Sequence, residues 1–307
     1  PAAGLFSEEV SMKRKRKISW PIIFILPFFI TYFIFNLFPI LFSFYISLTK
    51  WKGFGPMEFI GFRNYASLLK DTAFYRSLLN SIILVLEAMI PIQTLGLIVA
   101  LLLNYGFIKW GNSYVRNAMF LPYVTAPIAI GIIFSTMLDQ NFGIVNVMLR
   151  QWGIISSNID WLHNSAIAKP LVAFITNWRY IGYVAIIYLS GLQGISSEIY
   201  DAAKVDGASS PKAIIYVILP IMKPIIVFQT TIGIIGCLKI FEEPLMLFGD
   251  YKGGVGNAAQ TMNMKFLDTA FVSGQSGYGA ATGYAMFVVI LIFSFLYFSI
   301  INRNKEE

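Results

Sequence analysis

Residues 196–224 of the 307-residue chain read SSEIYDAAKVDGASSPKAIIYVILPIMKP. This polar segment lies between two long apolar runs, so it must lie in water if those runs cross a membrane. Ser197 can cap a first helix, and Glu198 and Asp201 then fall in its first turn, where the helix dipole favours negative charge. The segment therefore begins as a short surface helix.

The second half of the segment predicts a turn and another helix. Gly207 is a plausible stop for the first helix, because glycine readily adopts the left-handed conformation found there. Ser210 then reads as a cap, with Pro211 at the first helical position of a second helix that runs to Pro220. Plain connectors between membrane helices are usually short, so a folded loop of this length indicates a docking element.

The composition indicates an integral membrane protein. The chain is 57% hydrophobic and 13% charged, whereas soluble domains are about half apolar and a quarter charged. Single copies of cysteine (Cys237) and histidine (His163) exclude a disulfide framework and a histidine-rich metal cluster. The sequence contains no Gly-x-x-x-x-Gly-Lys-Ser/Thr phosphate loop, so any ATPase that drives this protein must be another chain.

The N-terminal residues carry a separate signal. Residues 1–11 differ in character from the remainder of the chain, so we expect Met12 to be the natural start and 1–11 to be a remnant of expression. Residues 12–19 contain the run KRKRK directly before an apolar stretch. Such a run is typical of a cytoplasmic membrane anchor and is poorly explained by nucleic-acid binding.

Six segments are long and apolar enough to cross a bilayer, which takes about 20 residues. They are Trp20–Ser47, Leu79–Leu103, Ala118–Leu138, Leu171–Leu192, Leu219–Phe241 and Tyr278–Ile301. The predicted fold is therefore all-α, with a transmembrane domain over 20–302. An even number of spans places both termini, including the short tail 303–307, in the cytoplasm, although the basic residues of the outer loop 48–78 run against the positive-inside tendency.

The opening segment resembles the EAA loop of the permeases of binding-protein-dependent ABC importers. The resemblance rests on Asp201-Ala202-Ala203, then Asp206-Gly207-Ala208, followed by Leu219-Pro220. One departure is Asp201, where the family has Glu, and Glu198 on the same helical face can share its role. The stretches 178–195, 241–261 and 278–281 are also similar to the sugar-importing branch, so the resemblance covers nearly the whole chain from about Trp20.

The resemblance implies a type I importer in a bacterial cell membrane, similar to the maltose type. Two different permease chains would form one path, an extracellular or periplasmic binding protein would deliver a carbohydrate, and an ABC ATPase dimer would bind ATP and Mg²⁺. The chain itself would be neither an enzyme nor a cofactor carrier. Loop 196–218 would couple it to the ATPase through Glu198, Asp201, Ala202, Ala203, Asp206, Gly207 and Ala208.

The sequence also offers candidates for a substrate pathway. They are polar or aromatic residues in or beside the spans: Glu87, Asn177, Trp178, Tyr183, Gln229, Lys239 and Glu242. Each has a structural alternative. Glu87 can make a hydrogen bond within the bundle. Trp178 and Arg179 fit an interfacial anchor at the start of the fourth span. Lys239, Glu242 and Glu243 can pair with one another.

Two further interpretations stay open at this point. In the outer loop, Trp161 and His163 either contact a binding protein or are simply solvated. At the level of the whole protein, the rival class is an ion-coupled secondary transporter, which needs a proton or ion relay in the membrane. Glu87 alone gives that class little support. A third possibility is a membrane-embedded enzyme. Such an enzyme would need clustered catalytic side chains within the spans, and this sequence shows no such cluster.

Overall fold

The computed structural model describes residues 20–105 and 112–303, so residues 1–11, the predicted N-terminal basic segment 12–19 and all of the predicted tail except Arg303 lie outside the described part. The chain forms two compact units, Pro1–Tyr45 and Ile46–Glu307, and each is described by itself. The proposed domain boundaries remain predictions.

The first unit is a single helical stretch. It contains α1 (Trp20–Tyr32), the π-helical segment η1 (Phe33–Leu37) and α2 (Phe38–Ser47), whose last two residues belong to the second unit. These segments abut without a break, which confirms the predicted first span. Between Ile23 and Tyr45 every side chain is exposed or half-buried, as expected for a helix whose apolar surface meets lipid.

The second unit begins with a small antiparallel ribbon of β1 (Thr49–Lys50) and β2 (Glu58–Phe59), in which Thr49 lies opposite Phe59. The rest of the unit is helical. Its α-helices are α3 (Arg63–Leu68), α4 (Thr72–Asn104), α5 (Asn112–Val124), α6 (Pro127–Met137), α7 (Ile144–Gln151), α8 (Ala168–Gln193), α9 (Ser197–Val205), α10 (Ser210–Ala213), α11 (Leu219–Leu238), α12 (Glu242–Phe248), α13 (Met262–Leu267) and α14 (Ser276–Arg303). Three short segments complete it, the π-helical η2 (Ile214–Ile218) and η4 (Asp268–Val272) and the 3₁₀ turn η3 (Val255–Asn257).

Five predicted spans are confirmed and the third is corrected. Among the described residues, five helices are long and apolar enough to cross a membrane, and a sixth crossing exists only if α5 and α6 count together. The two are bent by 93°, so the predicted third span, Ala118–Leu138, is divided between two helices. The cause is Pro127 at the start of α6, which forces the preceding Ala126 out of the helical region, to φ −57° and ψ 129°.

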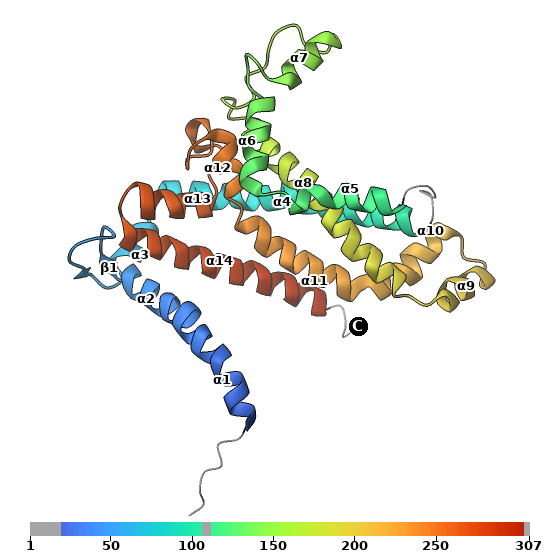
Figure 1. Cartoon of the computed structure of the whole chain (residues 1–307), viewed down its shortest axis with the longest axis horizontal. Coiled ribbons are helices and arrows are strands. Elements are labelled where there is room, and N and C mark those ends of the chain that lie inside the picture. Colours follow the sequence, from blue (N-terminus) through green and yellow to red (C-terminus); the bar gives the residue numbers. More distant parts are fainter. Residues whose placement is uncertain (1–19, 106–111, 304–307) are drawn as a thin grey trace, which may run out of the picture. The chain divides into compact units, whose positions relative to one another are not determined.

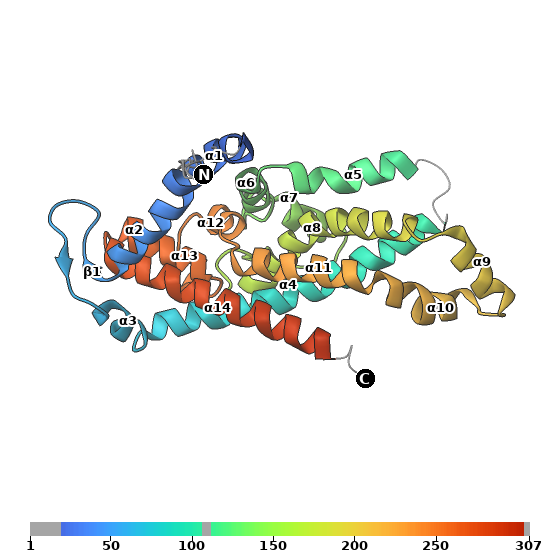
Figure 2. The ribbon, with the colours of Figure 1, turned by 90° about the horizontal axis from the view of Figure 1, so that it is seen from below.

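The core of the second unit is the contact between α4 and α8 (Figures 1 and 2). Small residues allow the close approach: a Cβ on Gly96 of α4 would lie 2.8 Å from a Val184 methyl, and a Cβ on Gly182 of α8 would lie 1.8 Å from the Met119 carbonyl oxygen of α5. Tyr188 of α8 is fully buried and donates its hydroxyl hydrogen bond to Gln93 of α4. These contacts hold α4, α5 and α8 as one packed layer.

The second helix of the polar segment does not end at Pro220. Helices α10, η2 and α11 follow one another without a gap, so one helix runs from Ser210 to Leu238. A proline in a regular helix clashes with the carbonyl four residues earlier. Here the wider π-helical turn η2 directly precedes Leu219 and Pro220, with the Leu219 N–H donating to the Ile214 carbonyl, and the helix continues through it.

The two ends of α8 define two opposite ends of the unit. Its 26 residues span about 39 Å, enough to cross a bilayer core of about 30 Å. One end follows the loop that holds α7, and the other leads directly into α9. Figure 1 shows α9 at the end of the bundle opposite α3 and α13. Segments α7 and α9 therefore adjoin opposite ends of α8.

A buried polar contact ties the α3 and α13 end together. The Tyr278 hydroxyl donates to the Asp71 carboxylate at 2.8 Å, and the Lys265 ammonium lies 3.4 Å from it. Burial pushes the pKa of Asp71 upward, but the Tyr278 hydrogen bond, the Lys265 charge and two backbone N–H groups outweigh burial and hold that pKa below its usual value. The ionised carboxylate thus joins α4, α13 and α14.

Candidate functional site

The turn after α9 is set by Gly207. This residue has φ +73°, the left-handed conformation that the sequence predicts for it. The Gly207 N–H donates to the Lys204 carbonyl at 3.0 Å and the Ala208 N–H donates to the Ala203 carbonyl at 2.9 Å. This pair of bonds is a Schellman motif, which closes the helix and reverses the chain toward α10.

The predicted caps lie one residue earlier than expected. Ser196, rather than Ser197, flanks α9, and Ser209, rather than Ser210, flanks α10, so that Pro211 is the second residue of its helix. Neither serine side chain makes a capping hydrogen bond. The Schellman turn and the proline, both backbone effects, therefore define this segment more than side-chain caps do.

The predicted coupling residues present a charged, accessible surface. Glu198, Asp201, Ala202, Asp206 and Gly207 are exposed, whereas Ala203 is buried and Ala208 is half-buried. Asp201 and Lys204 form an ion pair at 2.9 Å on this surface. Both side chains are exposed, so the pair contributes little to stability and leaves the carboxylate available to a partner.

Tyr200 attaches α9 to the bundle. Its hydroxyl donates to the Leu192 carbonyl of α8 at 3.2 Å and lies 3.4 Å from the Asn104 amide nitrogen at the end of α4. Its ring makes an edge-on contact with Tyr105, with centroids 6.4 Å apart. A movement of α9 is thereby passed to α4 and α8, not only to α10.

A cavity of about 230 Å³ lies between α4, α5, α8 and α11. Aromatic and amide side chains supply its polar surface. Its walls are Met89, Ile92, Gln93, Tyr123, Tyr180, Tyr183, Val184, Gln229, Ile232, Gly233, Gly236, Cys237 and Ile240.

Two tyrosines of the wall stack on each other, and one glutamine of the wall is buried. Tyr123 of α5 and Tyr183 of α8 stack with ring centroids 4.2 Å apart and an interplanar angle of 15°. Gln229 of α11 is only 3% exposed, so its amide is shielded from bulk solvent. Aromatic faces together with a few placed amides suit a ligand with both apolar faces and hydroxyl groups.

Only two of the seven predicted pathway residues, Tyr183 and Gln229, line this cavity. Asn177 donates from its amide nitrogen to the backbone carbonyl of Glu87 at 3.3 Å, so these two residues lie together elsewhere on α8 and α4. One Glu87 carboxylate oxygen is buried and makes no hydrogen bond within the described residues.

The other three predicted pathway residues lie apart from the cavity wall. Trp178 packs edge-on against Phe134 of α6, with centroids 5.5 Å apart. Lys239 is exposed at the end of α11, and Glu242 lies in the first turn of α12.

The interpretation of Arg179 as an interfacial anchor is wrong. Arg179 and Trp178 lie well inside α8, which begins at Ala168, and Arg179 forms a buried ion pair with Glu243 of α12. The expectation that Glu243 pairs within the group Lys239, Glu242 and Glu243 is also wrong, because its partner is Arg179. The Arg179 guanidinium also lies 5.1 Å from the centre of the Tyr180 ring, which lines the cavity. The ion pair therefore connects α12 to the cavity wall.

Tyr123 and Arg179 belong to this region, but the sequence pattern predicted neither of them as a member of the site. The bend between α5 and α6 directs Tyr123 onto Tyr183, and no local signal predicts that contact. Arg179 carries a weak signal, since a charged residue inside a long apolar helix needs a partner. In the described part of the chain, no group of three or more His, Cys, Asp or Glu side chains is arranged to hold a metal ion.

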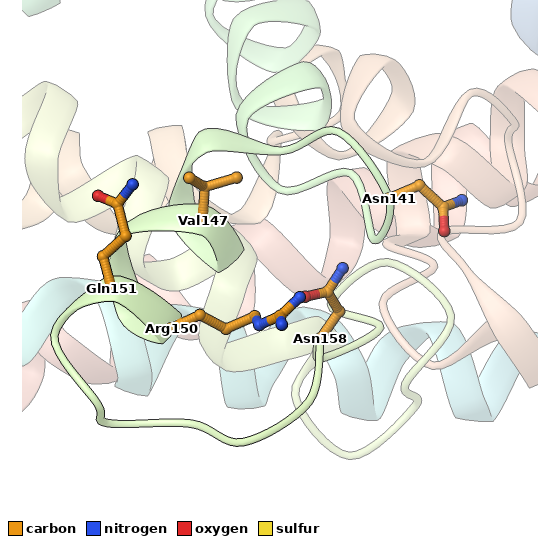
Figure 3. A pocket seen from close by; sticks show the side chains of 5 residues that line it. All are labelled: Asn141, Val147, Arg150, Gln151 and Asn158. Carbon is orange, nitrogen blue, oxygen red and sulfur yellow. The ribbon is translucent and has the colours of Figure 1, made fainter.

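The loop between α6 and α8 contains the remaining candidates. Trp161 is half-buried and donates its indole N–H to the Asn146 side chain at 3.0 Å, whereas His163 is exposed. The His163 ring lies 2.9 Å from the Asp160 carboxylate, and this hydrogen bond lowers the pKa of Asp160. A hollow of about 350 Å³ lies in this loop, and Figure 3 shows the side chains that line it, which are those of Asn141, Val147, Arg150, Gln151 and Asn158.

These features define a multi-pass membrane permease. Long apolar helices surround an internal cavity that carries a few polar groups, and a folded, charged segment lies at one end of them. Residues 92–305 match the family described as the inner membrane component of binding-protein-dependent transport systems, and the chain belongs to that family. Both predictions, the family and the all-α membrane fold, are thereby confirmed.

Individual relatives cover nearly the whole chain. The chain is 33% identical over 297 residues to the lactose transport system permease protein LacF of Rhizobium radiobacter, covering 96% of this chain and 98% of the relative. It is 31% identical over 288 residues to the arabinooligosaccharides transport system permease protein AraP of Bacillus subtilis (strain 168), covering 94% and 90%. These relatives are transport permeases and not enzymes, which favours the importer class over an ion-coupled secondary transporter.

Solved structures share the fold. A chain of a bacterial ABC transporter involved in the import of the acidic polysaccharide alginate matches with a TM-score of 0.81 and 21% identity, over 92% of this chain and 95% of that one. The alginate transporter in complex with an alginate pentasaccharide-bound periplasmic protein matches with a TM-score of 0.78 and 21% identity, over 90% and 92%.

Proposed function

We propose that this chain is the permease subunit of an ATP-driven importer that passes a carbohydrate, in the size range of an oligosaccharide, from an extracellular binding protein to the cytoplasm. The observation that carries the proposal is the continuous helix from Ser210 to Leu238. At one end it follows the exposed α9 turn, and further along it supplies Gln229 and Gly233 to the cavity wall. One rigid element thus links a docking surface to a ligand-sized space.

The substrate class is supported by both relatives and cavity chemistry. The relatives named above transport lactose and arabinooligosaccharides, and the matching structures import alginate. The stacked Tyr123 and Tyr183 rings offer an aromatic face to a sugar ring, while Gln93 and Gln229 offer amide groups to its hydroxyls. A site of this type binds neutral, hydroxylated ligands better than ions.

The coupling partner is an ABC ATPase dimer, which would hold ATP and Mg²⁺ and carry out their chemistry. Glu198, Asp201 and Asp206 are exposed acids that can pair with basic side chains on the ATPase. Ala202 adds a small exposed side chain that permits close approach. Closure of the ATPase dimer would push α9, and Tyr200 and α10 would carry the movement into the spans as a rigid-body rotation.

The remaining partners complete the path. A second, different permease would close the side of the cavity that this chain leaves open, and lipid would surround both chains. In this arrangement α9 and both termini face the cytoplasm of a bacterial cell, and α7 faces the binding protein. The family's dependence on a binding protein supports that partner.

Uptake by the reconstituted complex tests the proposal. We expect transport of labelled oligosaccharide into proteoliposomes to require ATP inside, the second permease and the sugar-binding protein. Tyr183→Ala and Gln229→Leu should each reduce uptake at least tenfold, whereas Trp178→Ala, which alters an aromatic residue outside the cavity, should change it less than twofold. Uptake that survives ATP depletion and stops when ion gradients collapse would instead establish a secondary transporter.

A further inference from the structure

Helix α7 presents an apolar face to its surroundings. Ile144, Val147 and Met148 recur at helical spacing, Trp152 follows eight residues after Ile144, and all four side chains are exposed. The one buried residue of α7 is polar, Asn146. A surface helix of a soluble segment normally turns its apolar stripe inward and its polar residues outward. Helix α7 buries the polar Asn146 and half-buries Val145 and Leu149, but it leaves the apolar Ile144, Val147 and Met148 exposed.

The Asn146 side chain holds α7 in this orientation. Its amide nitrogen donates to the Gln140 carbonyl at 3.2 Å and to the Ile159 carbonyl at 2.9 Å. Its amide oxygen accepts from the Ile159 N–H at 3.2 Å and from the Trp161 indole N–H at 3.0 Å. Every hydrogen-bonding group of the amide is used, so rotating the apolar face inward would break four bonds. The outward apolar face is a built feature of the loop.

Two residues next to the helix enlarge this face. Phe142 precedes α7 and Ile154 follows it, and both are strongly exposed. We call the resulting surface the α7 patch: Phe142, Ile144, Val147, Met148, Trp152 and Ile154. The polar hollow of Figure 3 borders the patch and shares Val147 with it, and the Arg150 side chain extends across the hollow toward Asn158.

The chemistry of the surface favours a protein over a lipid bilayer. An apolar centre containing tryptophan and methionine, next to an arginine and amide groups, is typical of the recognition surface of a protein complex. Helices that lie on bilayers carry several basic residues on their polar face, but α7 has one, Arg150. Lipid chains would also offer no polar partner to the exposed amide of Asn141 in the hollow.

The size and position of the patch indicate a reversible contact on the outer side. Six partly exposed side chains amount to roughly 500 Å² of apolar surface, counting about half of each side chain. A stable complex of standard size buries about 800 Å² per partner, so the patch supplies only part of one. It lies at the end of α8 opposite the α9 segment.

We propose that the α7 patch is a docking surface for the sugar-loaded binding protein, with Trp152 as its main anchor and the polar hollow as its rim. This inference rests on the proposed function, because it assigns a surface to the binding-protein partner.

Photo-crosslinking in intact cells locates the contact. A photoreactive phenylalanine analogue replaces Trp152 in one strain and Phe271 of η4 in another. The two native side chains have similar exposure, 69% and 73%. We expect the Trp152 position to form an adduct with the carbohydrate-binding protein of the same transport system, and the Phe271 position to form none. An adduct of the Trp152 position with lipid alone, or with the second permease alone, would overturn the proposal.

A titration in the reconstituted complex measures the contribution of the patch. The purified binding protein, loaded with sugar, is added to the transporter in nanodiscs and the stimulated ATPase rate is followed. Trp152→Glu should raise the half-saturating concentration of binding protein about tenfold or more, as for a central interface residue. Trp152→Phe should raise it less than threefold, and Phe271→Glu should leave it unchanged.

The titration separates two failures. If Trp152→Glu has the half-saturation of the natural protein, the α7 patch is not the docking surface, although the importer assignment stands. If the natural protein shows no stimulation by the loaded binding protein, the proposed function itself is wrong. Trp152 is exposed, so its replacement should leave assembly with the ATPase intact, and size-exclusion chromatography of the complex checks this.

Discussion

Breaking the ion pair between Arg179 and Glu243 should destabilise the protein strongly, and removing both charges should restore it. The two side chains are only 10% and 5% exposed, so either charge left alone would be buried without a partner. Loss of one member of a buried pair costs about 3–5 kcal/mol, whereas apolar replacement of both is often neutral. We therefore expect Arg179→Met to lower the melting temperature by roughly 10 °C.

The assay is thermal unfolding of the purified permease complex in one detergent, followed by fluorescence and size-exclusion chromatography. Arg179→Met/Glu243→Leu should recover most of the loss, and a double-mutant cycle gives the coupling energy. Arg150→Met is the matched control, because it removes an exposed arginine and should change stability by less than about 0.5 kcal/mol. If Arg179→Met melts with the natural protein, or the double variant is as unstable as the single ones, the reasoning is refuted.

Three further perturbations test other parts of the structure. Gly207→Val should reduce uptake about tenfold while membrane insertion is kept, because a left-handed conformation costs a non-glycine residue about 1–2 kcal/mol and more for a β-branched one. Gly182→Ala should lower the melting temperature, because the new methyl would lie 1.8 Å from the Met119 carbonyl oxygen, whereas Gly236→Ala has open space and should be neutral. The pKa of Asp71 is lower in the folded protein than in the unfolded chain, so its stabilising contribution is present above pH 4 and is lost as the pH falls through the folded value. The protection of α13 amides against hydrogen exchange, relative to their intrinsic exchange rate at each pH, should therefore fall below pH 4.

Each of these predictions has its own control. Gly207→Asn tolerates the left-handed conformation and should keep most of the uptake, so equal loss in both variants would remove the turn from the argument. Unchanged melting of the Gly182→Ala protein would show that α5 moves aside at little cost. Asp71→Asn should abolish the acid-induced loss of protection in α13, and persistence of that loss would assign it to other carboxylates.

Local chemistry was sufficient for several features. The polar segment after the fourth span is helical, and its Gly207 is left-handed, because a short helix followed by glycine and then Ser-Ser-Pro permits little else. Apolar length alone identified five membrane helices. The size of the bend in the third segment was not predicted, because the sequence shows that Pro127 disturbs a helix but not by how much, and the 93° bend depends on what α5 and α6 pack against.

The sequence by itself determined that the chain crosses a membrane several times, that it carries a folded polar segment after the fourth span and, through that segment, to which family it belongs. These properties follow from hydropathy and short-range backbone preferences, which act over a few residues. Only the tertiary structure decided that Tyr183 and Gln229 share a cavity while Lys239 and Glu242 lie outside it, that Arg179 pairs with Glu243, and that α7 exposes its apolar face. Those outcomes join residues distant in the chain, and which side chain meets which is decided by the close packing of whole helices.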